Sequence, residues 1–193
     1  MKQVSLSPDF SISQVVHGQM RINDWHLSSD QLLGQMKTIA SMGIDTFDNA
    51  DIYGNYTCEA LVGDALALDP SFRNSIKIIT KCGICIQSDK FPQRQIQFYD
   101  YSYDYIVGQV ENSLRNLRTD RIDLLLLHRP SYLLNPAEVA SAFDKLHADG
   151  KVLHFGVSNF YAHDFSMLQS YCNVPLITNQ IEVSPYCLEH LEN

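Results

Sequence analysis

Apolar runs and amphipathic segments alternate along the chain. Residues 3–13 predict a small hairpin. The run IDLLLLH at 122–128 is apolar at almost every position, as in a parallel strand that is covered on both faces. The segments with strand composition are 14–20, 44–48, 75–81, 122–128, 152–158 and 175–182. The pattern therefore predicts six strands after the hairpin.

Helices are expected between these strands, because apolar residues recur there at helical spacing. From Leu32 to Ala40 they follow the helical period, after a Ser or Asp cap and before Gly43. Asn135 is expected to cap a later helix, with Pro136 at its first position. The expected helices lie within 28–43, 61–66, 103–117, 135–150 and 162–171, and a long loop is expected at 82–101.

This order of strands and helices predicts one α/β domain over residues 1–193 with a parallel sheet. Two architectures fit, the doubly wound sheet and the β/α barrel. The first is disfavoured because no GxGxxG follows the first strand. The barrel is favoured because five polar residues end or directly follow a strand, and the C-terminal strand ends of a barrel open on one face. These residues are Asp48, Lys81, His128, Ser158 and Gln180.

Composition narrows the range of functions. Of the 193 residues 45% are hydrophobic, the net charge is −8, and no basic run occurs. Binding to nucleic acid or to an anionic membrane is therefore disfavoured. The chain shows no secretory signal and no stretch of membrane-spanning length, and its five cysteines, an odd number, suit a reducing cytoplasm. The CGIC pattern at 82–85 has no second ligand pair, so a structural role is favoured over a redox or metal site.

Four side chains form a candidate catalytic group. A lysine ammonium beside a tyrosine hydroxyl favours loss of the phenolic proton, and an aspartate within reach keeps that lysine charged and oriented. A histidine beside them can donate a hydrogen bond to a substrate oxygen on which charge develops. Asp48, Tyr53, Lys81 and His128 together suit protonation of a carbonyl oxygen while hydride reaches the carbon. Each of them alone also fits a structural role, as a turn cap, a core side chain or a strand end.

Several motifs, in order along the chain, resemble the aldo-keto reductases, and within that family the YdhF-like oxidoreductases of bacteria. They are GIDTFDNADIYGNYTCEALVG (43–63), IITK (78–81), DLLLLHRP (123–130), GKVLHFGVSNF (150–160) and NQIEVSP (179–185). The resemblance runs from about residue 15 to 187. It implies a β/α barrel that uses NADPH to reduce aldehydes and ketones.

The resemblance also implies a role for each residue of the candidate catalytic group. Tyr53 would be the proton donor, and Lys81 would promote the loss of its proton. Asp48 would pair with Lys81, and His128 would orient the substrate carbonyl.

Cofactor contacts are implied in the same way. Ser158, Asn159 and Gln180 would hold the nicotinamide carboxamide, and Gly18 to Met20 would lie near the nicotinamide ribose. Trp25 would form a wall of the substrate pocket, although a hydrophobic loop anchor is an alternative for this residue.

The chain ends just after its sixth expected strand, whereas an eight-stranded barrel takes about 250 residues. The expectation is therefore a C-terminally truncated, incomplete barrel that lacks its last two strands and their helices. In the family those segments carry an aromatic platform for the nicotinamide and basic residues for the adenosine 2′-phosphate, so this sequence does not separate NADPH from NADH. Open strand edges would also favour self-association.

Two other classes of function fit the same scaffold. A non-catalytic or regulatory nicotinamide-binding protein would keep the fold without turnover, and the complete catalytic group argues against it. A metal-dependent hydrolase would need converging histidine and carboxylate ligands. The other histidines give little support, because His147 lies on an expected helix, His154 inside a strand and His163 at a helix start. The prediction is a reductase of small-molecule carbonyl substrates.

Overall fold

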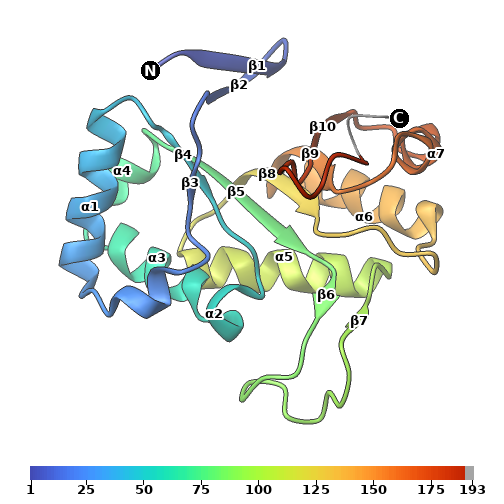
Figure 1. The fold of residues 1–193 in the computed structure, drawn as a ribbon, viewed down its shortest axis with the longest axis horizontal. Coiled ribbons are helices and arrows are strands. Elements are labelled where there is room, and N and C mark those ends of the chain that lie inside the picture. Colours follow the sequence, from blue (N-terminus) through green and yellow to red (C-terminus); the bar gives the residue numbers. More distant parts are fainter. Residues whose placement is uncertain (190–193) are drawn as a thin grey trace.

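Six strands pair into one curled parallel sheet in the order β10-β9-β8-β5-β4-β3 (Figure 1). The computed structural model describes residues 1–189. The strands are β3 (His17–Gly18), β4 (Thr46–Asp48), β5 (Lys77–Cys82), β8 (Ile122–Leu127), β9 (Val152–Ser158) and β10 (Leu176–Gln180). Every neighbouring pair in this sheet is parallel. The sheet is thus a half-barrel, which confirms the prediction of an incomplete β/α barrel.

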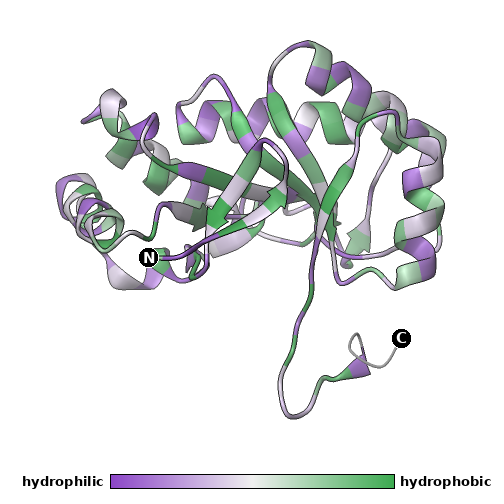
Figure 2. Ribbon diagram, turned by 90° about the horizontal axis from the view of Figure 1, so that it is seen from above, coloured by the Kyte–Doolittle hydropathy of each residue, from purple (hydrophilic) through white to green (hydrophobic). Residues whose placement is uncertain are grey.

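The helices connect successive strands and cover the outer side of the sheet (Figures 1 and 2). They are η1 (Ile22–Trp25), α1 (Ser29–Ser41), α2 (Tyr53–Tyr56), α3 (Cys58–Leu66), α4 (Pro70–Arg73), α5 (Tyr103–Leu117), α6 (Pro136–Ala148) and α7 (Ala162–Tyr171). The start of α1 is fixed by a capping box, in which Ser28 accepts from the N–H of Gln31 and the Gln31 side chain accepts from the N–H of Ser28. Asn135 caps α6 as expected.

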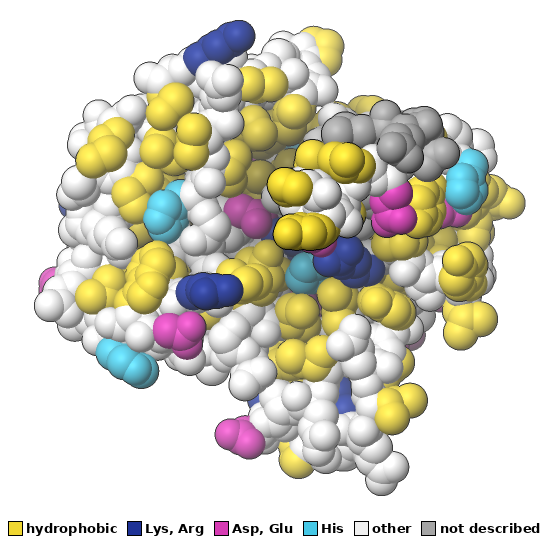
Figure 3. Space-filling view, viewed as in Figure 1, with side chains coloured by type: hydrophobic (Ala, Val, Ile, Leu, Met, Phe, Trp, Pro, Cys, Tyr) yellow, Lys and Arg dark blue, Asp and Glu magenta, His cyan; other side chains and the backbone are white. Residues whose placement is uncertain are grey.

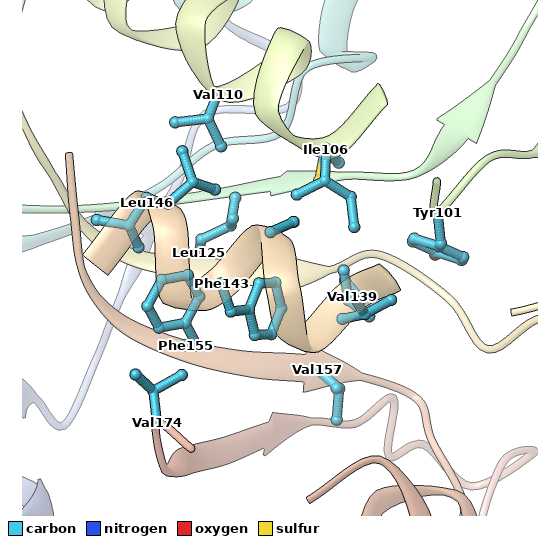
Figure 4. Close-up of a cluster of buried hydrophobic side chains, with 14 of the residues drawn as sticks. Tyr101, Ile106, Val110, Leu125, Val139, Phe143, Leu146, Phe155, Val157 and Val174 are labelled. Carbon is cyan, nitrogen blue, oxygen red and sulfur yellow. The ribbon is translucent and has the colours of Figure 1, made fainter. Parts of the chain in front are cut away.

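Two apolar layers fill the space between the sheet and the helices. The larger layer lies under α5, α6 and α7, and in it the rings of Phe143 and Phe155 stack at a centroid distance of 4.3 Å (Figure 4). The second lies under α1 and α3 and centres on Phe47, which is fully buried. These layers fix the strands from outside and leave their C-terminal ends free for polar residues.

The predicted hairpin, formed by β1 (Gln3–Ser7) and β2 (Phe10–Ser13), packs against the inner side of the sheet. Phe10 joins Ile79, Leu124 and Leu126 in a buried cluster. The N–H of Ser13 donates to the hydroxyl of Thr46 on β4 at 3.1 Å, which ties the hairpin to the sheet. The inner side is therefore filled by apolar side chains near the N-terminal strand ends.

Three local features differ from the sequence prediction. The first strand pairs only at His17–Gly18, opposite Phe47 and Asp48 of β4. The expected long loop contains a short antiparallel pair, β6 (Ile84–Cys85) with β7 (Phe98–Tyr99). The short helices η1, α2 and α4 were not predicted, although Asp69 before Pro70 is a helix-start signal for α4.

Candidate active site

The C-terminal ends of neighbouring strands bring the predicted polar residues to one cavity. Its volume is about 780 Å³, and Figure 3 shows a hollow in this face with acidic, basic and histidine side chains around it. Eight of the predicted site residues line it: Met20, Asp48, Tyr53, Lys81, His128, Ser158, Asn159 and Gln180. Because β4, β5, β8, β9 and β10 are consecutive in the sheet, residues far apart in the chain meet here.

Lys81 lies at the centre of the candidate catalytic group. Its Nζ donates to both carboxylate oxygens of Asp48, at 2.6 and 2.7 Å, and to the carbonyl oxygen of Asn49 at 2.9 Å. The same Nζ lies 3.1 Å from the hydroxyl oxygen of Tyr53. Lys81 is only 2% exposed, so water competes little for these contacts. Since the Tyr53 oxygen accepts from the ammonium, its own O–H can donate to a group in the cavity.

His128 stands beside Tyr53, with the two ring centroids 5.9 Å apart in an edge-to-face arrangement. It directly follows β8, and its backbone N–H donates to the carbonyl oxygen of Cys82 at 2.9 Å. Burial, with the nearby charges of Lys81 and Arg129, lowers the pKa of His128 to about 3. The ring is therefore neutral at neutral pH and carries one N–H donor. Its Nδ1 is buried without a hydrogen-bond partner among residues 1–189.

Ser158, Asn159 and Gln180 line the cavity at the ends of β9 and β10. The Ser158 hydroxyl donates to the carbonyl oxygen of Gln180 at 2.9 Å and accepts from the side-chain amide of Asn159 at 3.0 Å. The Asn159 side-chain oxygen accepts from the N–H of Glu182 at 2.8 Å, and Asn159 has a left-handed backbone with φ of +56°. Amide and hydroxyl groups are thus clustered and held by neighbouring backbone.

Gly18, Gln19 and Trp25 are the predicted site residues that the structure does not bring into the cavity lining. Ile22, at the start of η1, is buried in the core under α1 and α3, whereas Trp25, at its end, is 39% exposed. Its ring instead makes an edge contact with His17, at a centroid distance of 6.3 Å. The intervening Asn23 and Asp24 line the cavity in its place.

The sequence prediction missed the polar rim of the cavity. Its charged and amide side chains are Arg21, Asn23, Asp24, Asn55, Arg129 and Glu182. All of them lie in or beside the connections that follow strands. Their position could have been expected from the sequence, because the loops after the strands of a barrel form its site.

Other kinds of site receive no support from the described part of the chain. Within residues 1–189, no group of three or more His, Cys, Asp or Glu side chains is arranged to hold a metal ion. Burial raises the pKa of the Cys82 thiol and of the Cys85 thiol, which keeps both in the unreactive protonated form. Over the same residues, no helix has the length and apolar character needed to cross a membrane.

A curled parallel sheet with helices outside and a polar cavity at its C-terminal strand ends defines a protein of the β/α-barrel class. Residues 14–193 match the aldo/keto reductase family. The chain belongs to this family, which confirms the resemblance seen in its motifs.

Three curated relatives illustrate the similarity. The chain is 49% identical over 191 residues to the uncharacterized oxidoreductase YcsN of Bacillus subtilis, covering 99% of this chain and 64% of YcsN. It is 46% identical over 178 residues to the oxidoreductase YdhF of Escherichia coli, covering 92% and 58% of the two chains. It is 42% identical over 185 residues to a 6-dehydroglucose reductase of Agrobacterium fabrum, covering 95% and 62%. The chain thus spans less than two thirds of the length of each of these relatives.

A solved structure shows the same fold. The thermostable aldo-keto reductase Tm1743, crystallised with the inhibitor epalrestat, superposes with a TM-score of 0.81 at 23% sequence identity. The superposition covers all of this chain and 66% of Tm1743.

Proposed function

We propose that this protein is a nicotinamide-dependent reductase of aldehydes and ketones, with Tyr53 as the proton donor. The observation that carries the proposal is the position of the buried Lys81 ammonium, between the Asp48 carboxylate and the Tyr53 hydroxyl. This is the arrangement expected of a tyrosine that gives up a proton, because the adjacent cation stabilises the phenolate that remains. Membership of an oxidoreductase family agrees with this chemistry.

Each residue of the candidate catalytic group then has a distinct task. Asp48 neutralises Lys81 and fixes its direction, which keeps the ammonium aimed at the tyrosine oxygen. The neutral His128 ring can donate its N–H to the substrate carbonyl oxygen and hold it near the Tyr53 hydroxyl. Tyr53 transfers its proton to that oxygen as the carbonyl becomes an alcohol, and it recovers a proton from solvent afterwards.

The chemistry of the donor set at the ends of β9 and β10 fits a nicotinamide carboxamide. A carboxamide needs both hydrogen-bond donors and acceptors, and Ser158, Asn159 and Gln180 supply hydroxyl and amide groups of both kinds. Met20, exposed at the rim, would lie beside the ribose. A bound NADPH would supply the hydride for the carbonyl carbon, and NADH would supply it in the same way.

The rim of the cavity favours a polar, hydroxyl-bearing substrate. Arg21, Asn23 and Asp24 line one part of it, and Arg129 and Glu182 another. These groups can form hydrogen bonds with hydroxyl groups beside the carbonyl, which an unsubstituted aromatic aldehyde lacks. A relative that is named a 6-dehydroglucose reductase agrees with a sugar-like substrate class.

Turnover provides the test of this proposal. Consumption of NADPH is measured with an aromatic aldehyde and with a hydroxylated aldehyde, for the parent protein and for Tyr53→Phe. We expect activity in the parent, a higher kcat/KM for the hydroxylated substrate, and loss of activity in Tyr53→Phe. Tyr171→Phe, on an exposed tyrosine at the end of α7, is the matched control and should retain activity. Normal turnover by Tyr53→Phe would contradict the assigned chemistry.

We also propose that two copies of the chain associate through the edges of the sheet. β3 and β10 each have one sheet neighbour within residues 1–189, so each presents backbone groups on its outer side. A second copy can pair with such an edge.

A further inference from the structure

The backbone that follows Tyr53 has an unusual conformation. Gly54, Asn55 and Tyr56 have φ angles of +57°, +55° and +70°, so three consecutive residues are left-handed. Glycine and asparagine adopt this region readily, but a tyrosine rarely does, because its Cβ crowds the following carbonyl oxygen. Contacts outside the turn must therefore hold Tyr56 in place.

The side chain of Tyr56 supplies such contacts. It is only 6% exposed, and its hydroxyl oxygen accepts from the backbone N–H of Ile86 at 3.0 Å and from Nη1 of Arg94 at 2.7 Å. Burial raises the pKa of Tyr56, so the hydroxyl stays neutral. Both donors come from the β6–β7 connection, thirty or more positions along the chain from Tyr56.

Arg94 is itself fixed by aromatic rings. Its guanidinium carbon lies 3.9 Å from the ring centroid of Phe91, 5.7 Å from that of Tyr56 and 5.8 Å from that of Phe98. The rings of Phe91 and Tyr56 also meet edge to face at 4.9 Å. A guanidinium between aromatic faces gains cation–π attraction in several directions, so Arg94 links the β6–β7 connection firmly to Tyr56.

The turn transmits this constraint to Tyr53. The N–H of Thr57 donates to the carbonyl oxygen of Tyr53 at 3.1 Å. The Thr57 hydroxyl donates to the carbonyl oxygen of Gly54 at 2.6 Å. These bonds make residues 53–57 one closed unit. Rotation of Tyr56 out of its left-handed conformation would therefore tilt Tyr53 and lengthen its 3.1 Å contact with Lys81.

We propose that Tyr56 and Arg94 are positioning residues for Tyr53. They keep the turn at residues 54–56 left-handed and thereby hold the Tyr53 hydroxyl against Lys81. The proposal rests on the proposed role of Tyr53 as proton donor, but the placement of Tyr53 can be measured without turnover. It also makes the β6–β7 hairpin part of the active-site framework, although of its residues 84–99 only Ile84 lines the cavity.

The test compares Tyr56→Phe, Arg94→Ala and their double variant with the parent protein. The ¹³Cζ chemical shift of Tyr53, assigned by its absence in Tyr53→Phe, reports the hydrogen bonding of the hydroxyl. We expect this signal to move in all three variants, and amide exchange at residues 53–57 to become faster. The changes in the double variant should be no larger than those in the more strongly affected single variant, because both residues act through one contact. Tyr171→Phe, on an exposed residue of α7, should leave the signal unchanged.

Kinetics supply a readout that a general loss of stability would not give. We expect kcat to fall by about 10- to 100-fold, as for a small displacement of a reacting group, with little change in KM. Arg94→Lys keeps the charge but not the planar guanidinium. Its kcat should therefore lie between that of Arg94→Ala and that of the parent. It also carries the test if Tyr56→Phe fails to fold.

The outcomes separate this proposal from the proposed function. An unchanged Tyr53 signal in folded Tyr56→Phe and Arg94→Ala would overturn the positioning role. If the parent protein shows no turnover but the Tyr53 signal still shifts in the variants, the positioning role is supported and the reductase proposal is refuted. A loss of kcat with no movement of the Tyr53 signal would also refute the positioning role.

Discussion

At the scale of single residues, the ion pair of Lys81 and Asp48 is buried and so bears on stability. Lys81 is nearly inaccessible, and the Asp48 side chain is 12% exposed. Removing one partner leaves a buried charge without compensation, which typically costs about 3–5 kcal/mol. The pairing of these two residues therefore affects the stability of the fold, whether or not the protein is active.

We predict that Lys81→Met lowers the free energy of unfolding by about 3–5 kcal/mol, because Asp48 loses its cation. Urea denaturation at neutral pH measures the change. The double variant Lys81→Met, Asp48→Leu should recover part of the loss, since no buried charge then remains. A loss below about 1 kcal/mol in Lys81→Met would show that the pair is far more hydrated than its burial indicates.

The pH dependence of stability provides a prediction for His128. Its pKa of about 3 in the folded chain lies below the ordinary value of 6.5, so the unfolded chain binds a proton first as pH falls. The His128 contribution is therefore complete above pH 6.5 and declines toward pH 3, by up to about 1.4 kcal/mol for each pH unit.

His128→Gln should remove this slope. The difference in unfolding free energy between the parent and the variant is measured from neutral pH to about pH 5, and it should shrink by about 1–2 kcal/mol. His163→Gln is the control, because the His163 side chain is 80% exposed. Parallel curves for the parent and His128→Gln would contradict the neutral, buried histidine.

At the scale of elements, two helices meet at a glycine. A Cβ on Gly63 in α3 would lie 1.9 Å from the carbonyl oxygen of Asn116 in α5. Gly108, also in α5, has no atom within 4 Å of such a Cβ. In the sequence both are glycines within a helical pattern. Only the packing around them differs.

We predict opposite effects of the same substitution at these glycines. Gly63→Ala should destabilise the protein by about 1–3 kcal/mol, since α3 and α5 must move apart. Gly108→Ala should stabilise it by about 0.5–1 kcal/mol, because alanine favours a helix. Thermal or urea unfolding measures both, and equal signs for the two variants would refute the close approach of α3 and α5.

At the scale of the whole molecule, net charge opposes the proposed association of sheet edges. The chain carries a net charge of −8 at pH 7 and has an isoelectric point near 5.2. Repulsion between copies should therefore weaken as pH falls toward that point.

We predict that association, measured by sedimentation velocity, increases from neutral pH to about pH 6 and with added salt, which screens the repulsion. Thr178→Lys on the edge strand β10 should reduce it, because a charged edge disfavours pairing. Ser141→Lys on the exposed side of α6 adds the same charge away from the edges, and it should leave the association unchanged. A monomer under all these conditions, or equal effects of the two lysines, would refute pairing through β10.

Local patterns in the sequence determined the elements of this protein and their order. The capping residues Ser28 and Asn135 begin their helices where expected, because caps and apolar periods act within a few residues. The polar residues at strand ends were also recognisable, since strands that run parallel must end on one side. The curled parallel sheet and the gathering of Asp48, Tyr53 and Lys81 follow from these signals.

Only the tertiary structure decided which other side chains reach the cavity and what holds Tyr53 there. Trp25 lies outside the cavity lining, exposed and with its ring against His17, which composition does not reveal. The contact between Tyr56 and Arg94 joins residues 38 positions apart. Such contacts depend on how distant segments pack, whereas a sequence pattern reports only on neighbours along the chain, and this is the physical reason for the difference.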